Sequence, residues 1–106
     1  MTPSTFTPKA RYGEPYEPVE CFRFTATIAG RSREYALHYL DGWRVSDPES
    51  GLRIINVIGP RGGSANKSMP DLAMRLALEQ LEEFATTAGW AFYNKALESA
   101  PYRDLA

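Results

Sequence analysis

The sequence predicts an α+β fold in which a four-stranded antiparallel β-meander is followed by one long amphipathic helix packed on one face of the sheet. Between residues 20 and 59, apolar residues alternate with polar ones, which is typical of strands with one buried face. Between 68 and 88 they recur with a helical period. A chain of 106 residues can build one core, so we expect a single domain over 20–106 behind an N-terminal arm over 1–19.

The N-terminal arm is rich in proline, which excludes a helix or a central strand and predicts extended chain. The prolines concerned are Pro3, Pro8, Pro15 and Pro18. The arm also carries three aromatic anchors, Phe6, Tyr12 and Tyr16. We expect it to dock on its own domain, and we retain Tyr12 and Tyr16 as candidate contacts to a partner.

Four strands are expected in the sheet, over 20–28, 33–40, 43–45 and 52–59. The second is apolar on both faces, which predicts a central position. Asp41-Gly42 is a hairpin turn signal between the second and third strands. In the last strand, the adjacent Ile54 and Ile55 interrupt the alternation, which indicates a bulge or burial on both faces.

The helix over 68–88 is marked at both ends. Ser68 is a suitable N-cap, Pro70 falls in the first turn, and Asp71 can complete a capping box. Gly89 would close the C-terminus. At about 100° per residue, one stripe should face the sheet, and it consists of Ala73, Met74, Ala77, Leu78, Leu81, Phe84, Ala85 and Ala88.

Leu72 and Leu76 lie one turn apart, outside this stripe, and form a second apolar patch. Either another part of the chain covers them or they contact a partner. The C-terminal segment over 90–106 begins with a short predicted helix, Trp90 to Ser99, ended by Pro101. Its large apolar side chains need cover at the sheet edge or between subunits, so a homodimer remains open.

Composition and charge narrow the possible functions. The formal net charge of −1 implies no strong attraction to nucleic acid or anionic lipid. We find no signal peptide and no apolar run long enough to span a bilayer, so a cytoplasmic protein without membrane association is expected. The single cysteine, Cys21, excludes an internal disulfide.

No residue pattern predicts catalysis, a cofactor or a metal. The loop GPRGGSANK over 59–67 joins a strand to a helix N-terminus, where anions bind, but its spacing matches neither phosphate-binding glycine motif. Cys21 and His38 are the one conceivable nucleophile and base, and no third group or oxyanion site accompanies them. We expect a buried cysteine, a surface histidine, no zinc site and no enzyme.

The favoured hypothesis is a non-enzymatic protein-binding module, an inhibitor or adaptor that covers a surface of a larger assembly. Phage and mobile-element proteins that block host defence, such as anti-CRISPR proteins, are small chains of this kind, although no motif points to them. The expected contacts are the aromatic arm, the loop with Arg61 and Lys67, and the Leu72/Leu76 patch.

The alternative hypothesis is a nucleic-acid-binding module. The strand phases place Arg23, Arg44 and Arg53 on the sheet face that the helix leaves open. Arg61 and Lys67 lie in the loop beside this face. Such a face can hold a single strand by phosphate contact and stacking.

Overall fold

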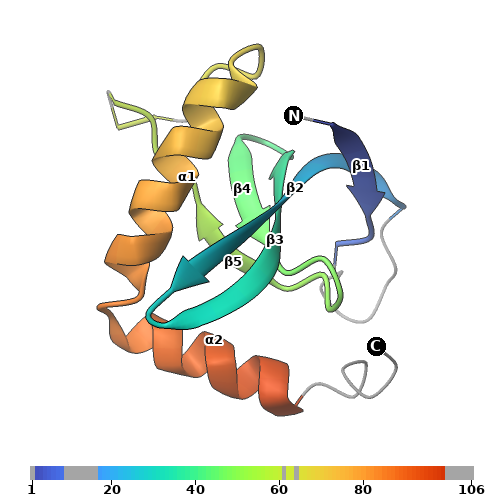
Figure 1. Cartoon of the computed structure of the whole chain (residues 1–106). Helices are drawn as coiled ribbons and strands as arrows, with labels where there is room; N and C mark the ends of the chain where they lie inside the picture. The colour runs from blue at the N-terminus through green and yellow to red at the C-terminus, as the bar shows by residue number, and fades with distance from the viewer. Residues whose placement is uncertain (1, 9–16, 61, 64, 100–106) are drawn as a thin grey trace.

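Five antiparallel strands form one sheet in the computed structural model, which describes residues 2–8, 17–60, 62–63 and 65–99. The strands, paired in chain order, are β1 Pro3–Phe6, β2 Val19–Ile28, β3 Arg31–Tyr39, β4 Trp43–Ser46 and β5 Arg53–Asn56. Two helices follow, α1 Pro70–Phe84 and α2 Ala88–Ser99 (Figure 1). The predicted α+β class and antiparallel sheet are confirmed, but the sheet has five strands where four were predicted.

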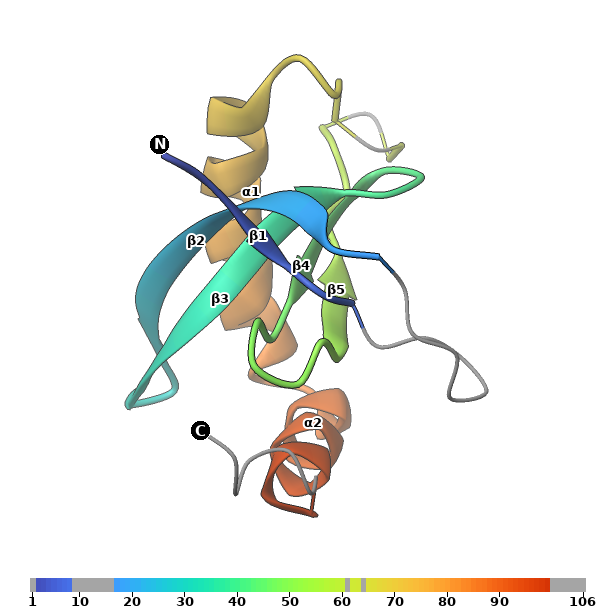
Figure 2. The ribbon, with the colours of Figure 1, turned by 90° about the vertical axis from the view of Figure 1, so that its right-hand side faces the viewer.

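The strand that the sequence did not predict is β1, which lies in the arm and pairs with β2. Pro3 is its first residue, a position at a sheet edge where a missing N–H is tolerated. Phe6 is 4% exposed and packs on Cys21 and Ala36. Figure 2 shows β1 on the opposite side of the sheet from α1. The arm therefore docks on its own domain through Phe6.

The main core lies between α1 and the other face of the sheet. Cross-strand register aligns Phe22, Leu37, Val45 and Ile55 on β2 to β5. The helix contacts all four of these strands. Its Ala73, Ala77 and Leu81 are fully buried, because the two small alanines let the helix approach the sheet and the leucine fills the space beyond them. The predicted irregularity in the last strand is present as a register shift opposite Val45 and Ser46.

The start of α1 differs from the prediction. The N-cap is Met69, and no side chain caps it. Ser68 instead donates from its backbone N–H and its hydroxyl to Oδ1 of Asn66, at 2.9 and 2.8 Å. The predicted Ser68–Asp71 capping box is therefore wrong, because a local turn on the Asn66 side chain engages the serine.

The buried face of α1 is also rotated from the predicted stripe. Leu78, predicted to face the sheet, is 39% exposed, whereas Leu72 and Leu76 are half-buried and pack against the core. At about 100° per residue, Leu76 and Leu78 fall on opposite flanks of a face centred on Ala77. The rest of the chain thus covers Leu72 and Leu76 in part, and neither side chain is fully buried.

A sharp corner joins the two helices. Thr86 and Thr87 donate from their hydroxyls to the carbonyls of Glu83 and Phe84, each at 2.7 Å, and end α1 before the predicted Gly89. Gly89 lies instead in the first turn of α2. A Cβ placed on it would lie 2.6 Å from the Phe84 ring, so a side chain at this position would have to displace that ring.

Gly89→Ala is expected to destabilise the protein by about 1 kcal/mol. The added methyl must displace the Phe84 ring, and such overpacking outweighs the better helix propensity of alanine. Gly63→Ala is the matched control, because a Cβ there meets no atom within 4 Å. Urea unfolding of both variants measures the difference, and equal free energies of unfolding would show that the ring moves without penalty.

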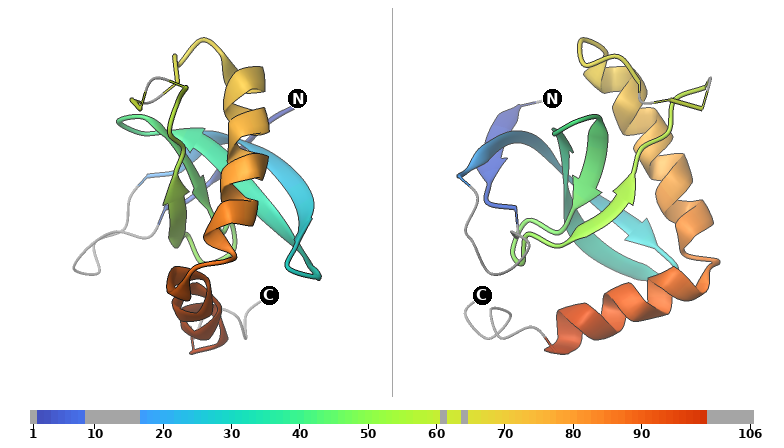
Figure 3. Two further views of the ribbon diagram at one scale, coloured as in Figure 1. Left: turned by 90° about the vertical axis from the view of Figure 1, so that its left-hand side faces the viewer. Right: turned by 180° about the vertical axis from the view of Figure 1, so that it is seen from behind.

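Helix α2 covers one end of the sheet, near the β2–β3 turn (Figure 3). Tyr93 and Leu97 are buried, Arg31 donates to Oδ1 of Asn94 at 3.3 Å, and Arg33 lies over the Tyr93 ring at 5.5 Å. The predicted C-terminal helix is therefore present. Phe92, however, is 74% exposed, so the expected cover for this side chain does not come from the described part of the chain.

Candidate functional site

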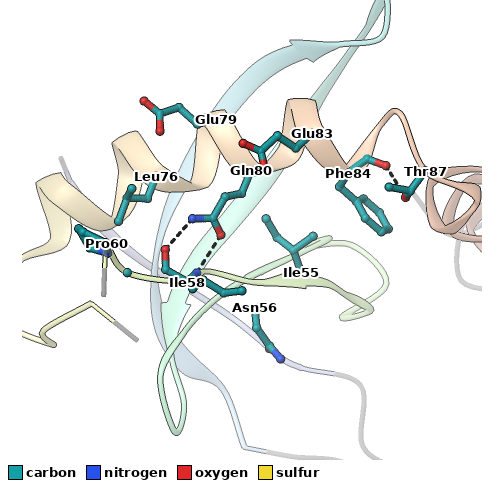
Figure 4. Close-up of a pocket in the computed structure, with 11 residues that line it drawn as sticks. Ile55, Asn56, Ile58, Pro60, Leu76, Glu79, Gln80, Glu83, Phe84 and Thr87 are labelled. Atoms are coloured by element: carbon teal, nitrogen blue, oxygen red, sulfur yellow. Dashed lines mark hydrogen bonds between the residues drawn. The ribbon is translucent and has the colours of Figure 1, made fainter. Parts of the chain in front are cut away.

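A groove runs between the last strand of the sheet and α1. It has a volume of about 560 Å³, within the range of roughly 300–1,000 Å³ that is usual for ligand pockets. Its lining comes from β5, from the chain that follows β5, and from one flank of α1. The lining residues are Ile55, Asn56, Ile58, Gly59, Pro60, Leu76, Glu79, Gln80, Glu83, Phe84 and Thr87 (Figure 4).

Much of the groove wall is apolar. Ile58 is 53% exposed, and Leu76 and Phe84 are only half-buried, so these side chains have apolar surface left to cover. The alanine-rich contact of α1 holds the helix close to the sheet, which brings Leu76 within reach of the segment after β5. This combination of a helix flank and a sheet edge is a common geometry for peptide recognition.

Gln80 crosses the groove and pairs with the backbone of Ile58. The Ile58 N–H donates to Oε1 of Gln80 at 2.8 Å, and Nε2 of Gln80 donates to the Ile58 carbonyl at 2.6 Å. Figure 4 shows both hydrogen bonds. The side-chain amide therefore satisfies both polar groups of one backbone residue at the edge of the sheet, as a neighbouring strand would.

Two carboxylates, Glu79 and Glu83, lie along the rim one helical turn apart. Both side chains are exposed, and neither forms an ion pair with a residue that the structure describes. Like charges four residues apart on a helix repel each other by a few tenths of a kcal/mol. The rim therefore favours a positively charged group from outside.

Of the two leucines that the sequence singled out, one belongs to the groove. Leu76 lines it. Leu72 is half-buried and packs against the core cluster without lining the groove. The predicted contact of this leucine pair with a partner stays a prediction.

The three predicted arginines do share the sheet face opposite α1. Register aligns Arg23 with Ala36, Ser46 and Arg53 in one cross-strand row, and places Arg44 opposite His38 in the next. Arg23 is already engaged, because it donates to Oε1 of Glu34 at 2.9 Å and to the Thr5 carbonyl at 2.8 Å. Arg44 is half-buried, and Arg53 is exposed.

The open basic face expected from the sequence is partly covered by β1. The Phe6 ring meets the His38 ring edge-on, with 4.7 Å between centroids. His38 is 2% exposed, so the prediction of a surface histidine was wrong. The error arose because β1 was not expected in the sheet. Less cationic surface remains on this face than the strand phases alone suggested.

The loop and arm residues contribute less. Lys67 is exposed and lies over the Tyr39 ring, 5.4 Å from its centroid. Arg61, Tyr12 and Tyr16 lie outside the described residues. Their predicted contacts therefore stay predictions.

Cys21 and His38 both lie against Phe6 beneath β1, in an arrangement that does not activate either group. Burial raises the pKa of the Cys21 thiol, and the charge of Arg23 only partly opposes this. Burial, with a smaller contribution from Arg44, lowers the pKa of His38 to about 4. Nε2 of His38 lies 2.8 Å from the Ser46 hydroxyl. A nucleophilic cysteine needs a lowered pKa, so the shift at Cys21 runs against that chemistry.

Within the described ranges, no group of three His, Cys, Asp or Glu side chains is arranged to hold a metal ion. The same part of the chain contains no helix that is long and apolar enough to cross a membrane.

Sequence reasoning missed most of the groove, including Ile58, Gln80 and the two rim glutamates. One signal was present. Gln80 falls beside Ala73 and Phe84 on the helical wheel, so it places an amide on the side of the helix that otherwise faces the sheet. A polar group in such a position usually has a hydrogen-bonding partner.

In comparisons with protein-family models, with curated proteins and with solved structures, no match to this chain was found.

Proposed function

We propose that this protein is a non-enzymatic binding module that covers a surface of a protein partner. The observation that carries the proposal is the groove between β5 and α1, with partly exposed apolar walls and an acidic rim that forms no ion pair with a described residue. Apolar surface of this kind, bordered by polar groups, is typical of interaction sites. Within this class we include an inhibitor or adaptor of a larger assembly, such as phage and mobile-element proteins that block host defence.

We place the nucleic-acid hypothesis second, because of the charges in the groove and on the opposite face of the sheet. The groove rim is acidic and would repel a phosphate backbone. On the opposite face, Arg23 is exposed but is held by Glu34 and by the Thr5 carbonyl, Arg44 is half-buried, and Arg53 is exposed. If nucleic acid were the ligand, Arg53→Glu would weaken binding, and affinity would fall steeply with salt.

Leu76→Lys is expected to reduce the affinity for the partner by about tenfold or more, because it places a charge on the apolar wall of the groove. Leu78→Lys is the matched control, since it makes the same change on the opposite flank of the same helix. Affinity capture from a nuclease-treated extract of the native host recovers the partner, and calorimetry with the purified partner measures both variants.

Several results would contradict the proposal. Loss of all captured protein after nuclease treatment would favour nucleic acid. If Leu76→Lys and Leu78→Lys reduced the affinity equally, the partner would not bind in the groove. Thermal unfolding of both variants checks that each is folded, because the stem of a lysine can lie along apolar surface with its charge in water.

A further inference from the structure

In the part of the chain that the structure describes, no further strand pairs with the outer edge of β5. β5 is the last strand of the sheet and pairs with β4 on one side. The Val57 N–H donates to the Trp43 carbonyl at 2.9 Å, so Val57 directs its backbone groups toward β4. In an antiparallel pair, successive residues alternate in direction. Asn56 and Ile58 therefore direct their backbone groups away from β4, toward the groove.

Gln80 occupies one of these two positions. Its amide accepts from the Ile58 N–H and donates to the Ile58 carbonyl, which is the pair of hydrogen bonds that a residue of an added strand would make. The side chain thus stands in for one residue of a sixth strand. It is tethered by a flexible side chain, so an arriving backbone can replace both hydrogen bonds as Gln80 turns outward.

The walls and rim define the side chains that such a strand would carry. On the α1 side, every second residue of an added strand would face the groove. Leu76, Ile58 and Phe84 offer apolar contacts there. Glu79 and Glu83, which form no ion pair within the described ranges, offer partners for a cation. An extended segment with apolar residues and a lysine or arginine at alternate positions fits both features.

We propose that the groove binds an extended segment of a protein partner, which adds to β5 as a sixth strand and directs apolar and basic side chains toward α1. This inference rests on the proposed function and specifies how the partner is recognised. A second copy of this chain fits less well. Antiparallel pairing of two β5 edges has a two-fold axis perpendicular to the sheet, which would bring two α1 helices to the same face. Their Glu79 and Glu83 carboxylates would then approach one another.

The test uses a capped heptapeptide, Thr-Val-Thr-Lys-Thr-Val-Thr, in which valine and lysine share one face of a strand. Titrated to millimolar concentration into ¹⁵N-labelled full-length protein, it is expected to shift the backbone amide signals of Asn56 and Ile58 in a saturable way. The side-chain amide signal of Gln80 should move with them, because the peptide replaces its two hydrogen bonds.

Two methylated peptides test strand addition directly. A strand presents the N–H groups of alternate residues to opposite edges. Methylation of one alternate set should therefore abolish binding, while methylation of the other set should leave it unchanged, because those groups face solvent. A peptide with glutamate in place of lysine should bind at least about tenfold more weakly, since it meets Glu79 and Glu83 with like charge.

Protein variants complete the test. Gln80→Ala is expected to bind the heptapeptide about threefold or more tightly, because nothing then competes for the Ile58 backbone. The double variant Glu79→Gln/Glu83→Gln should weaken binding several-fold and reduce its salt dependence. Glu82→Gln changes a neighbouring glutamate that does not line the groove, and should bind as the unchanged protein does.

The outcomes separate this inference from the proposed function. If no amide shift occurs at millimolar peptide, or if both methylated peptides bind equally, strand addition is wrong. If Gln80→Ala weakens binding, Gln80 is a contact to the ligand and does not stand in for a strand, which also overturns the inference. Concentration-dependent shifts of β5 without peptide would make a second copy the occupant. In each case, the Leu76→Lys and Leu78→Lys comparison with the captured partner still decides whether the groove binds protein.

Discussion

Leu81→Asp is expected to unfold the protein. Leu81 is 0% exposed and belongs to the core cluster between α1 and the sheet. Its replacement removes roughly 1.5–3 kcal/mol of apolar burial and places a carboxylate where no described side chain can pair with its charge. An unpaired buried charge is destabilising by several kcal/mol more. The free energy of unfolding of native domains is only about 5–15 kcal/mol. The free energy lost in this variant therefore approaches or exceeds that total.

Circular dichroism and a proton NMR spectrum of the purified variant measure the outcome. Two control variants distinguish the effect of the buried position from the effect of the introduced charge. Leu81→Met keeps the volume and is expected to lose less than about 1.5 kcal/mol. Leu78→Asp introduces the same charge on an exposed flank of the same helix and is expected to remain folded. A folded Leu81→Asp variant, with thermal stability close to that of Leu78→Asp, would contradict the packing described here.

The elements with a clear period could be predicted from the sequence because a single buried face imposes that period locally. Alternation along 22–28 follows from a strand with one face against α1, and the register aligns Phe22 with Leu37 and Val45 as the strand phases require. The helix over 70–84 could be predicted for the same reason, because its buried alanines and leucine recur with a helical period. From β2 to β5, neighbours in the sheet are also neighbours in sequence, so short connections determined their pairing.

Features that depend on distant parts of the chain could not be predicted in this way. β1 carries a proline and only four residues, and its pairing with β2 is stabilised by Phe6 on Cys21 and Ala36. Phe6 could be recognised as an anchor of the arm, but nothing in the arm itself indicates that it pairs with β2 as a strand. The rotation of α1 arises similarly. Leu76 and Leu78 lie on opposite sides of Ala77 on a helical wheel, and the position of the β5 edge determines what lies beside Leu76.

The candidate site likewise contains residues that a local sequence pattern could identify and residues that only the tertiary structure reveals. Leu76 could be singled out, because it lies off the predicted stripe of an otherwise regular helix. The pairing of Gln80 with Ile58 could not, because 22 residues separate the two partners and the hydrogen bonds require a specific height of α1 over the sheet. Arg23, Arg44 and Arg53 were placed correctly on one face. Their availability was overestimated, because the ion pair of Arg23 and the cover from β1 are tertiary contacts.

Acidification from pH 7 to pH 4 is expected to destabilise the protein by about 3 kcal/mol through His38 alone. The pKa of this histidine is lowered from 6.5 to about 4, chiefly because it is buried between the sheet and Phe6, and further by the charge of Arg44. In the unfolded chain the imidazole takes up a proton near pH 6.5. Between these two values the unfolded state binds more protons than the native state, so stability falls as the pH falls.

The pH range of this effect follows from the pKa values of His38 in the unfolded chain and in the native protein. The contribution of neutral His38 is fully present above about pH 6.5, declines between 6.5 and 4, and is lost below the native pKa of about 4. Each pKa unit corresponds to about 1.4 kcal/mol. Protonation would also break the packing under β1, because a charged ring would then lie against Phe6. The protection of β1 amides against hydrogen exchange, relative to their intrinsic rates at each pH, should therefore fall on acidification before global unfolding occurs.

His38→Gln is the comparison that isolates this residue. Its amide keeps a group able to hydrogen-bond to the Ser46 hydroxyl and does not titrate. Urea unfolding at pH 7, 6, 5 and 4 should show the unchanged protein losing about 3 kcal/mol more than the variant across this range. The carboxylates common to both proteins contribute equally and cancel. Parallel losses in the two proteins would mean that His38 is protonated in the native state, which is incompatible with its burial beneath β1.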